Sequence, residues 1–427
     1  MHSSRIFLPG QAVSLFGDGL AILAVPLAVL QLTDNPLLAA LASAPRLVGY
    51  LIAGLPAGPL VDRTDPWRVL ITADVARLMI FLTLSGAITL RVCPVAVVLG
   101  LAIAAGIAGV FFETALTVAV RDLYDGQKLL RTNAFLETSG QLSIVLGPAA
   151  VGLLAAGCGV GAALLVNAMT FAVSLATLWR TARSATSVRV LASRQLSEPT
   201  TDQVPITGTL HRSYLELRAG LRYLTASTIL GGLVLLQVIT NFAQGSETLI
   251  PYFARERLGA STALVGLVVA GGGVGGVLGA LCASTIAARL PPISLCALGA
   301  LSISGALGLI GVAPDVLCLA AAHALLAGAS VLVVVVVRTL RQQLVPRAML
   351  GRVTSAARSA ILAAATSGAL LAGLLTRFDG NNPRPIFVCA ALIIALSTPI
   401  VWLNGLARHR HLPPASNTRS SCVNTSS

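Results

Sequence analysis

Ionisable residues are scarce within the long apolar stretches of this chain, and they are the first candidates for chemistry. A charge inside lipid is costly and usually serves a function, such as pairing with another charge or carrying a proton. The candidates are Asp18, Arg46, Asp74, Arg77, Glu113, Glu137, Glu247 and His323. The sequence has no Walker-type nucleotide loop, no soluble catalytic domain and no cysteine pair with metal-ligand spacing. We therefore expect no enzyme, cofactor or metal site.

Asp18 and Arg46 are predicted to form a charge pair. Asp18 lies near the middle of the first apolar run, and Arg46 lies in the outer half of the second. If the two runs are antiparallel helices, the residues differ in depth by roughly 6 Å, which an extended arginine spans. An acid whose partner moves away is protonated more easily. The pair is therefore a candidate proton switch, with a static buried pair as the alternative.

A polar helical face precedes a second acid, Glu247. The face consists of Gln237, Asn241, Gln244 and Thr248, and these are our candidates for lining a substrate site. Glu247 lies beside this face and is a candidate for binding a cation or a proton. His323 stands alone in its apolar run, which favours a hydrogen-bonded structural histidine over a proton carrier. Glu113 and Glu137 lie near helix ends, and we expect structural or gating contacts with Arg121 or Arg131.

The elements that carry these residues must lie in lipid. Apolar residues make up 56% of the chain and charged residues 11%, and the mean hydropathy is +0.86. Runs of about 20 apolar residues predict membrane-spanning helices. The candidate spans are 6–32, 37–61, 69–90, 94–118, 134–156, 160–179, 228–252, 262–287, 292–312, 315–337, 355–376 and 385–405. The fold class is thus an all-α integral membrane protein with twelve transmembrane helices in two pseudo-symmetric six-helix bundles.

The positive charges predict the orientation of these spans. The net charge is +13, but the basic residues are spread between apolar runs, which does not fit a nucleic-acid binder. Arg and Lys populate the N-terminus, the even-numbered loops and the C-terminal tail. The opposite side holds only Arg91, Arg255, Arg257, Arg377 and Arg384. The richer side should be cytoplasmic, which places both termini inside. The first run is too long for a cleaved signal core and carries Asp18, so we expect a retained span.

The domain organisation follows from the same pattern. We predict an N-terminal bundle at 1–180, a cytoplasmic linker with an amphipathic helix at 181–225, a C-terminal bundle at 226–406 and a disordered cytoplasmic tail at 407–427. The fourth loop, from Arg121, and the tenth loop, from Arg341, share a weak internal repeat. A second weak match joins Gly58-Pro-Leu to Gly279-Ala-Leu. Two parallel six-span halves are one expected layout of transporters.

The second loop reads Gly58-Pro-Leu-Val-Asp62-Arg63-Thr-Asp-Pro-Trp-Arg68 and resembles the signature loop of the major facilitator superfamily. Asp65 and Trp67 replace a glycine and a basic residue of that signature. Asp74 and Arg77 fit the acid and arginine of its multidrug, macrolide and siderophore exporter branch. Glycine at 58 permits close helix approach, and Asp62 can face a helix N-terminus or Arg121. The resemblance implies a gating role for Gly58, Asp62, Arg63, Arg68, Asp74, Arg77 and Arg121; a plain basic loop is the alternative.

A glycine-rich segment in the fifth span carries a second resemblance. Gly140, Gly147, Pro148 and Gly152 resemble the antiporter signature of the same superfamily, although its last glycine pair is reduced to one. Proline bends a helix, and glycines let another helix pack against the bend. In the family this motif marks exporters that exchange substrate for protons. An ordinary kinked packing helix is the alternative.

Together the resemblance implies a secondary active transporter of the bacterial cytoplasmic membrane. We expect it to export a small amphiphilic molecule, such as a drug, a secondary metabolite or a siderophore, by proton antiport with alternating access. Its partners would be that molecule, protons and the lipid bilayer, with no nucleic acid, and it would work as a monomer. The alternatives are uptake or facilitated transport, including that of lysolipid, and a non-transporting receptor or assembly factor on the same scaffold.

Overall fold

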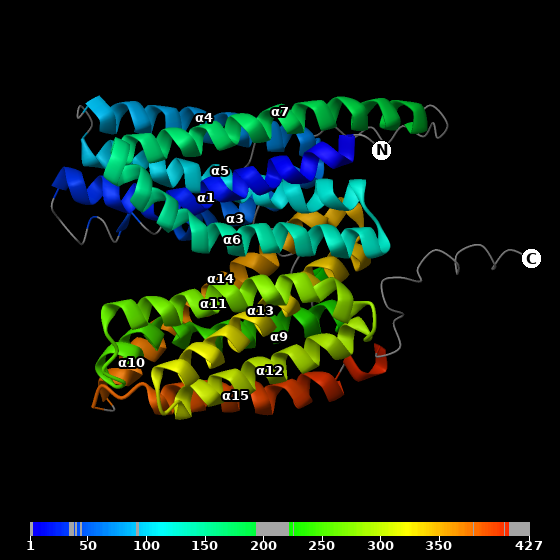
Figure 1. The fold of residues 1–427 in the computed structure, drawn as a ribbon. Helices are drawn as coiled ribbons and strands as arrows, with labels where there is room; N and C mark the ends of the chain where they lie inside the picture. The colour runs from blue at the N-terminus through cyan, green and yellow to red at the C-terminus, as the bar shows by residue number, and fades with distance from the viewer. Residues whose placement is uncertain are drawn as a thin grey trace, which may run out of the picture. The chain divides into compact units, whose positions relative to one another are not determined.

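All regular elements of the computed structural model are helices within the residues that it describes, which are 3–33, 38, 41–42, 45–90, 94–193, 222–224, 226–378, 380–404 and 406–409 (Figure 1). Most of the predicted linker, including most of its amphipathic helix, and the tail from residue 410 lie outside these residues. Eleven segments within the described part are long and apolar enough to cross a membrane. The predicted span at 37–61 overlaps helix α3 and residues outside the described part.

The described chain forms two compact units, and each unit includes a short segment from the other half of the sequence. The first unit comprises Met1–Leu123, Ser143–Leu221 and Arg347–Ala356; the second comprises Tyr124–Leu142, Arg222–Pro346 and Ala357–Ser427. Helices α6 (Gly126–Cys158) and α14 (Leu350–Phe378) therefore each begin in one unit and end in the other.

The first unit is built on α1 (Ser3–Thr33), α3 (Pro45–Arg63), α4 (Pro66–Leu90), α5 (Val95–Leu123) and α7 (Val160–Ser193), together with the second half of α6, the short η2 (Arg347–Met349) and the start of α14. Within it, α1 and α4 both pack on α7, while α3 and α4 pack on α5. Glycines allow this approach: a Cβ at Gly17 of α1 would lie 3.1 Å from the Cβ of Thr170 on α7.

The second unit contains the first half of α6, α9 (Thr228–Gln244), η1 (Gly245–Leu249), α10 (Ile250–Glu256), α11 (Thr262–Ala287), α12 (Pro292–Val312), α13 (Val316–Leu344), the rest of α14, α15 (Arg384–Asn404) and η3 (Leu406–His409). Helix α13 is central because α11, α12 and α9 all pack against it. A Cβ at Gly279 of α11 would lie 2.7 Å from the Cα of Gly328 on α13, so this contact requires glycine.

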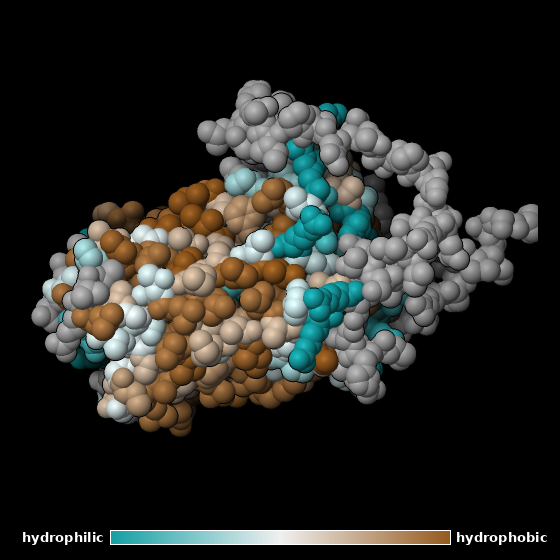
Figure 2. Space-filling view, turned by 90° about the horizontal axis from the view of Figure 1, so that it is seen from above, coloured by the Kyte–Doolittle hydropathy of each residue, from teal (hydrophilic) through white to brown (hydrophobic). Residues whose placement is uncertain are grey.

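The surface matches a lipid environment. Large apolar side chains are strongly exposed, with Leu153 at 79%, Leu403 at 73% and Leu370 at 71%. Figure 2 shows one face on which apolar residues cover most of the surface and hydrophilic residues gather toward one end. Since water would penalise so much exposed apolar area, the finding confirms the prediction of an all-helical membrane protein.

Several helices continue past the predicted spans into the predicted loops. Helix α5 ends at Leu123 and α6 begins at Gly126, so little of the fourth loop lacks helical structure. Helix α7 runs to Ser193, so the linker predicted from 181 begins inside a helix. Hydropathy marks only the part of a helix that lies in lipid. Helical turns that are polar are therefore not detected by hydropathy.

Candidate functional site

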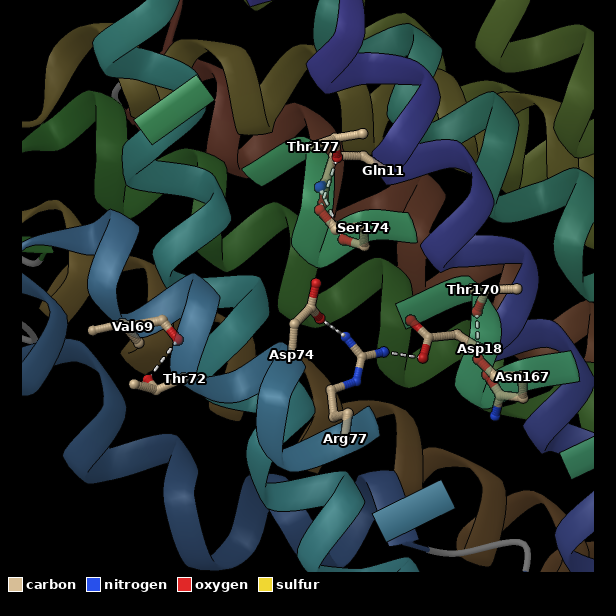
Figure 3. Close-up of polar contacts among 10 residues, drawn as sticks. All are labelled: Gln11, Asp18, Val69, Thr72, Asp74, Arg77, Asn167, Thr170, Ser174 and Thr177. Carbon is tan, nitrogen blue, oxygen red and sulfur yellow. Dashed lines mark hydrogen bonds and ion pairs between the residues drawn. The ribbon is translucent and has the colours of Figure 1, made fainter. Parts of the chain in front are cut away.

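Two carboxylates and one guanidinium form a cluster in the first unit, which we call the Asp18 cluster: Asp18 on α1 with Asp74 and Arg77 on α4 (Figure 3). Arg77 donates hydrogen bonds to both acids and lies between them; the contact with Asp74 is 3.3 Å. Asp74 and Arg77 are three residues apart, which places them on the same side of α4.

Burial differs sharply between the two acids of the cluster. The side chain of Asp74 is 0% exposed and that of Arg77 is 4%, whereas that of Asp18 is 46% exposed. The guanidinium carbon of Arg77 lies 4.0 Å from the ring centroid of Phe171 and 5.0 Å from that of Phe112. Aromatic faces attract a cation, so this arginine is held charged in a dry environment. Asp18 is the member of the cluster that is open at the surface of the described structure.

The charges of the Asp18 cluster do not balance. Two ionised carboxylates face one guanidinium, which leaves an excess negative charge. In addition, the Oδ2 atom of Asp74 makes no hydrogen bond of regular geometry among the described residues, and the hydroxyl of Ser174 is the neutral group that acts on this carboxyl besides Arg77. An unpartnered buried charge is costly. A proton on either acid removes the excess charge, so the cluster has the composition of a proton-binding site.

The structure gives Asp18 a partner that the sequence did not suggest. The structure gives it Arg77, and the side chain of Arg46 lies outside the described residues, so a pair with Arg46 stays a prediction. The sequence placed Arg77 with the signature loop because of the family resemblance. The position of Arg77 along its helix was nevertheless compatible with this pair. Counted along the helix axes from the starts of α1 and α4, Asp18 and Arg77 differ in depth by roughly 6 Å.

The signature loop makes a second charged contact inside the first unit. Asp62, near the end of α3, accepts hydrogen bonds from the backbone N–H groups of Gly351 at 2.7 Å and Arg352 at 3.0 Å. The Nε atom of Arg352 is 3.6 Å from the same carboxylate. These N–H groups belong to the first turn of α14, where helices leave donors unpaired and favour negative charge. Of the two partners considered for Asp62, the helix N-terminus is the one observed, not Arg121.

Gly58 makes this contact possible. A Cβ at Gly58 would lie 2.7 Å from the Cα of Arg352, and one at Gly351 would lie 2.6 Å from the Oδ1 atom of Asp62. The ends of α3 and α14 therefore touch backbone to backbone. Nearby, Arg347 binds Asp122 through two hydrogen bonds of 2.8 Å.

The two departures from the family signature have structural roles at the start of α4. Asp65 accepts a hydrogen bond of 3.2 Å from the backbone N–H of Trp67. Trp67 is 2% exposed and packs edge-on against Phe7 of α1, with ring centroids 5.8 Å apart. The signature residues Arg63 and Arg68 are exposed, and Arg121 lies in the last turn of α5.

Three polar contacts join α9 and η1 to α13 in the second unit, and we call them the α9–α13 seam. They pair Gln237 with Arg341 at 2.8 Å, Gln244 with Ser330, and Glu247 with His323 at 2.9 Å. As the residue number rises on the first element it falls on α13, as antiparallel helices require.

The seam changes the interpretation of the polar face. Gln237 and Gln244 use their side-chain oxygens to bind α13, so both are interhelical contacts. Asn241 donates to the carbonyl of Gln237, and Thr248, which is exposed, donates to that of Gly245. A substrate-lining role for the four residues stays a prediction.

His323, which stands alone in its apolar run, has partners on two other elements of the second unit. Its Nε2 atom contacts Glu247, and its Nδ1 atom contacts the carbonyl of Val268 on α11 at 2.9 Å. Glu247 comes from η1, a short break between α9 and α10. A pair 76 positions apart gives no periodic signal, so spacing along the sequence did not reveal it.

The remaining acids also have partners other than those expected. Tyr50 of α3 donates a hydrogen bond to Glu113. Glu137 forms an ion pair of 3.0 Å with Arg338 of α13, rather than with Arg121 or Arg131. The side chain of Glu137 is 16% exposed and that of Arg338 is 21%. These contacts fit the structural role expected for both acids.

The glycine-rich motif of α6 is only partly used for packing. A Cβ at Gly147 would lie 2.9 Å from the Cα of Gly19 on α1, so this pair of glycines brings two backbones together. Pro148 follows inside the helix. A Cβ at Gly140 or Gly152 would meet no heavy atom of the described residues within 4 Å.

These helices and the buried charge cluster define a multi-pass membrane protein of the transporter class. The family model described as Major Facilitator Superfamily matches residues 7–366, and the chain belongs to this superfamily. It is therefore a secondary transporter of small molecules and not an enzyme. This confirms the family resemblance seen in the second loop.

Relatives and solved structures agree with this assignment. The chain is 29% identical to the enterobactin exporter EntS of Escherichia coli over 311 residues, or 70% of this chain and 68% of the relative. A bacterial homologue of the iron transporter ferroportin, in the outward-facing state, has a TM-score of 0.71 at 17% identity, covering 94% of this chain and 99% of that one. The E. coli fucose:proton symporter FucP has a TM-score of 0.69 at 15% identity, covering 94% and 98%. At these identities the two structures show the fold alone.

Proposed function

We propose that this protein exports a small amphiphilic molecule, such as a siderophore, a drug or another secondary metabolite, in exchange for protons. Similarity to an enterobactin exporter supports both the direction and the cargo class. The charge distribution supports a bacterial cytoplasmic membrane with the even-numbered loops and both termini inside. The α6 motif adds support for exchange, because it resembles the antiporter signature.

The observation that carries the proposal is the Asp18 cluster. Arg77 serves two acids, of which one is 0% exposed and the other 46% exposed. A proton entering from water meets Asp18 first. Once Asp18 is neutral, Arg77 is free to bind Asp74 with its whole guanidinium, and Asp74 gains the partner that its Oδ2 atom lacks.

This exchange changes the contact between two helices as well as a charge. Asp18 is on α1 and Arg77 is on α4, so protonation weakens the polar contact between them. Loss of the proton restores it. A site whose helix contacts depend on a proton couples the proton gradient to conformational change, provided that the two conformations differ in proton affinity.

A vesicle experiment tests the proposal directly. Membrane vesicles of inverted orientation, containing the full chain, are given an acidic interior, and accumulation of iron-free enterobactin and of a panel of amphiphilic drugs is followed. We expect accumulation that a proton ionophore abolishes. Accumulation that ignores the ionophore would remove proton coupling, and accumulation only in right-side-out vesicles would favour uptake.

Variants separate coupling from binding. Asp18→Asn should retain exchange of substrate across the membrane and lose gradient-driven accumulation. The matched control is Glu256→Gln, which removes a carboxylate that is 55% exposed and lies outside the cluster. If Asp18→Asn and Asp62→Asn both leave transport and compound sensitivity unchanged, a non-transporting receptor becomes the better account.

A further inference from the structure

The contacts of His323 with Glu247 and Val268 determine where hydrogen atoms must lie on its ring. Both ring nitrogens of His323 face oxygen atoms at 2.9 Å: Nδ1 faces the carbonyl of Val268, and Nε2 faces the carboxylate of Glu247. A carbonyl oxygen accepts and never donates, so Nδ1 must carry hydrogen. A neutral imidazole then has no hydrogen left on Nε2.

The bond between Nε2 and the Oε1 atom of Glu247 therefore needs a proton of its own. It lies either on nitrogen, giving an imidazolium beside a carboxylate, or on oxygen, giving a neutral imidazole beside a carboxylic acid. Without it, a nitrogen lone pair would face a carboxylate oxygen at hydrogen-bonding distance, and the two groups would repel each other.

We propose that Glu247 and His323 form a second proton-binding site, whose proton holds η1 against α13. Its role in transport rests on the proposed function. Loss of the proton to water breaks the third contact of the α9–α13 seam and leaves Gln237–Arg341 and Gln244–Ser330 in place. The end of the seam at η1 then opens while the rest stays closed.

The surroundings of His323 offer no other charge to replace that proton. Helix α6 meets α13 through Glu137, which is already paired with Arg338, and η1 meets it through Glu247. The other elements packed on α13 are α11, α12 and α9, and none of these three contains Asp, Glu, Lys, Arg or His. Their other ionisable residues are Cys282 and Cys296. Among the described residues of these elements and η1, Glu247 is the acid that faces the ring.

The two members of the pair differ in exposure. The side chain of His323 is 8% exposed, whereas that of Glu247 is 41% exposed. Protons therefore enter and leave through the glutamate while the histidine stays fixed by Val268. A Cβ at Gly272 would lie 2.6 Å from the Nε2 atom, so glycine at this position leaves room for the ring against α11.

The test detects the proton itself, in the full chain purified in lipid nanodiscs. Nitrogen-15 NMR of labelled histidine is read at neutral pH, and His323→Gln identifies the resonance among the five histidines of the chain. Infrared spectra then compare wild type with Glu247→Gln. We expect either two protonated ring nitrogens, or one protonated Nδ1 with a carboxylic-acid band that Glu247→Gln removes. Glu256→Gln and Thr248→Ala should leave both spectra unchanged.

Contrary outcomes are clear and separate this inference from the proposed function. A neutral ring with bare Nε2 and no carboxylic-acid band from Glu247 overturns the site, even where Asp18→Asn uncouples transport. A ring protonated on Nε2 alone also overturns it, because Nδ1 then does not donate to Val268. If the proton is found but transport ignores an ionophore, the site stands and the coupling proposal fails.

Discussion

Arg77 is the residue on which both acids of the Asp18 cluster depend. Its guanidinium is nearly buried and lies over the rings of Phe171 and Phe112. Aromatic faces favour the cation, so the arginine stays charged whichever carboxylate it binds more closely. Asp18 and Asp74 therefore compete for one partner, and a proton on one acid strengthens the bond of the other.

Removing this arginine should destabilise the protein. Arg77→Gln leaves Asp74 buried without a cation, and breaking a buried pair in this way costs roughly 3–5 kcal/mol. We expect a lower Tm of the purified protein in detergent. Adding Asp74→Asn should recover most of the loss, because no buried carboxylate then remains. A single variant with the wild-type Tm, or a double variant no better than the single, would contradict the proposed charge balance.

Asp62, which lies just past the predicted span 37–61, should give stability a pH dependence. Burial raises the pKa of Asp62 to about 6, against the opposing effect of the backbone N–H groups of Arg352 and Gly351. In the unfolded chain this pKa is about 4. The folded carboxyl thus binds a proton more tightly, so its stabilisation is fully present below about pH 4 and is lost as the pH rises through about 6.

The measurement compares Tm at pH 5 and pH 7 in wild type and Asp62→Asn. Wild type should gain more Tm on acidification than the variant, which lacks the titrating group. Asp65→Asn, in the same loop, is the control and should behave as wild type does. An equal gain in wild type and Asp62→Asn would show that the contact with α14 is not linked to this proton.

At the scale of single helices, the two glycines of α6 make a matched pair. Gly147 lies against the backbone of Gly19, whereas a Cβ at Gly152 meets no described heavy atom within 4 Å. Gly147→Val should force α1 and α6 apart and cost roughly 1–3 kcal/mol, as overpacking does. Gly152→Val should keep the wild-type Tm and expression level. Equal effects of the two substitutions would mean that this close approach is not important for stability.

Much of the helical architecture could be predicted from hydropathy alone. The predicted span 292–312 coincides with α12, and 262–287 coincides with α11. The errors lie where helices leave the lipid, as at the ends of α5 and α7. At these ends the chain is still helical but is no longer apolar, so a hydropathy scale does not predict the last helical turns.

The candidate site residues were predictable by type but not by partner. Asp18, Arg77, Glu247 and His323 were all evident as ionisable groups in apolar runs. Periodicity indicates the face and depth of a residue, but it does not indicate which helix packs against that face. The Asp18–Arg77 and Glu247–His323 pairs depend on the packing of α1 with α4 and of η1 with α13. Only the fold supplies this information.

At the scale of the whole molecule, the distribution of arginine predicts topology. Both termini and the even-numbered loops should be cytoplasmic, which requires an even number of spans. A fluorescent-protein fusion at either terminus should mature and fluoresce, whereas a periplasm-active phosphatase fused after Arg91 or Arg377 should be active. Activity of that phosphatase at the C-terminus would contradict both the orientation and the span count.

The exchange of segments between the two units has a consequence for synthesis on the ribosome. Asp62 precedes Gly351, its backbone donor, by 289 residues. At roughly 5–20 residues per second, these donors leave the ribosome on the order of 15 to 60 s after the carboxylate. Until then the nascent first unit lacks the helix turn that covers its signature loop. A chain cut within the linker never receives that turn, so the first unit is a poor candidate for expression as an isolated fragment.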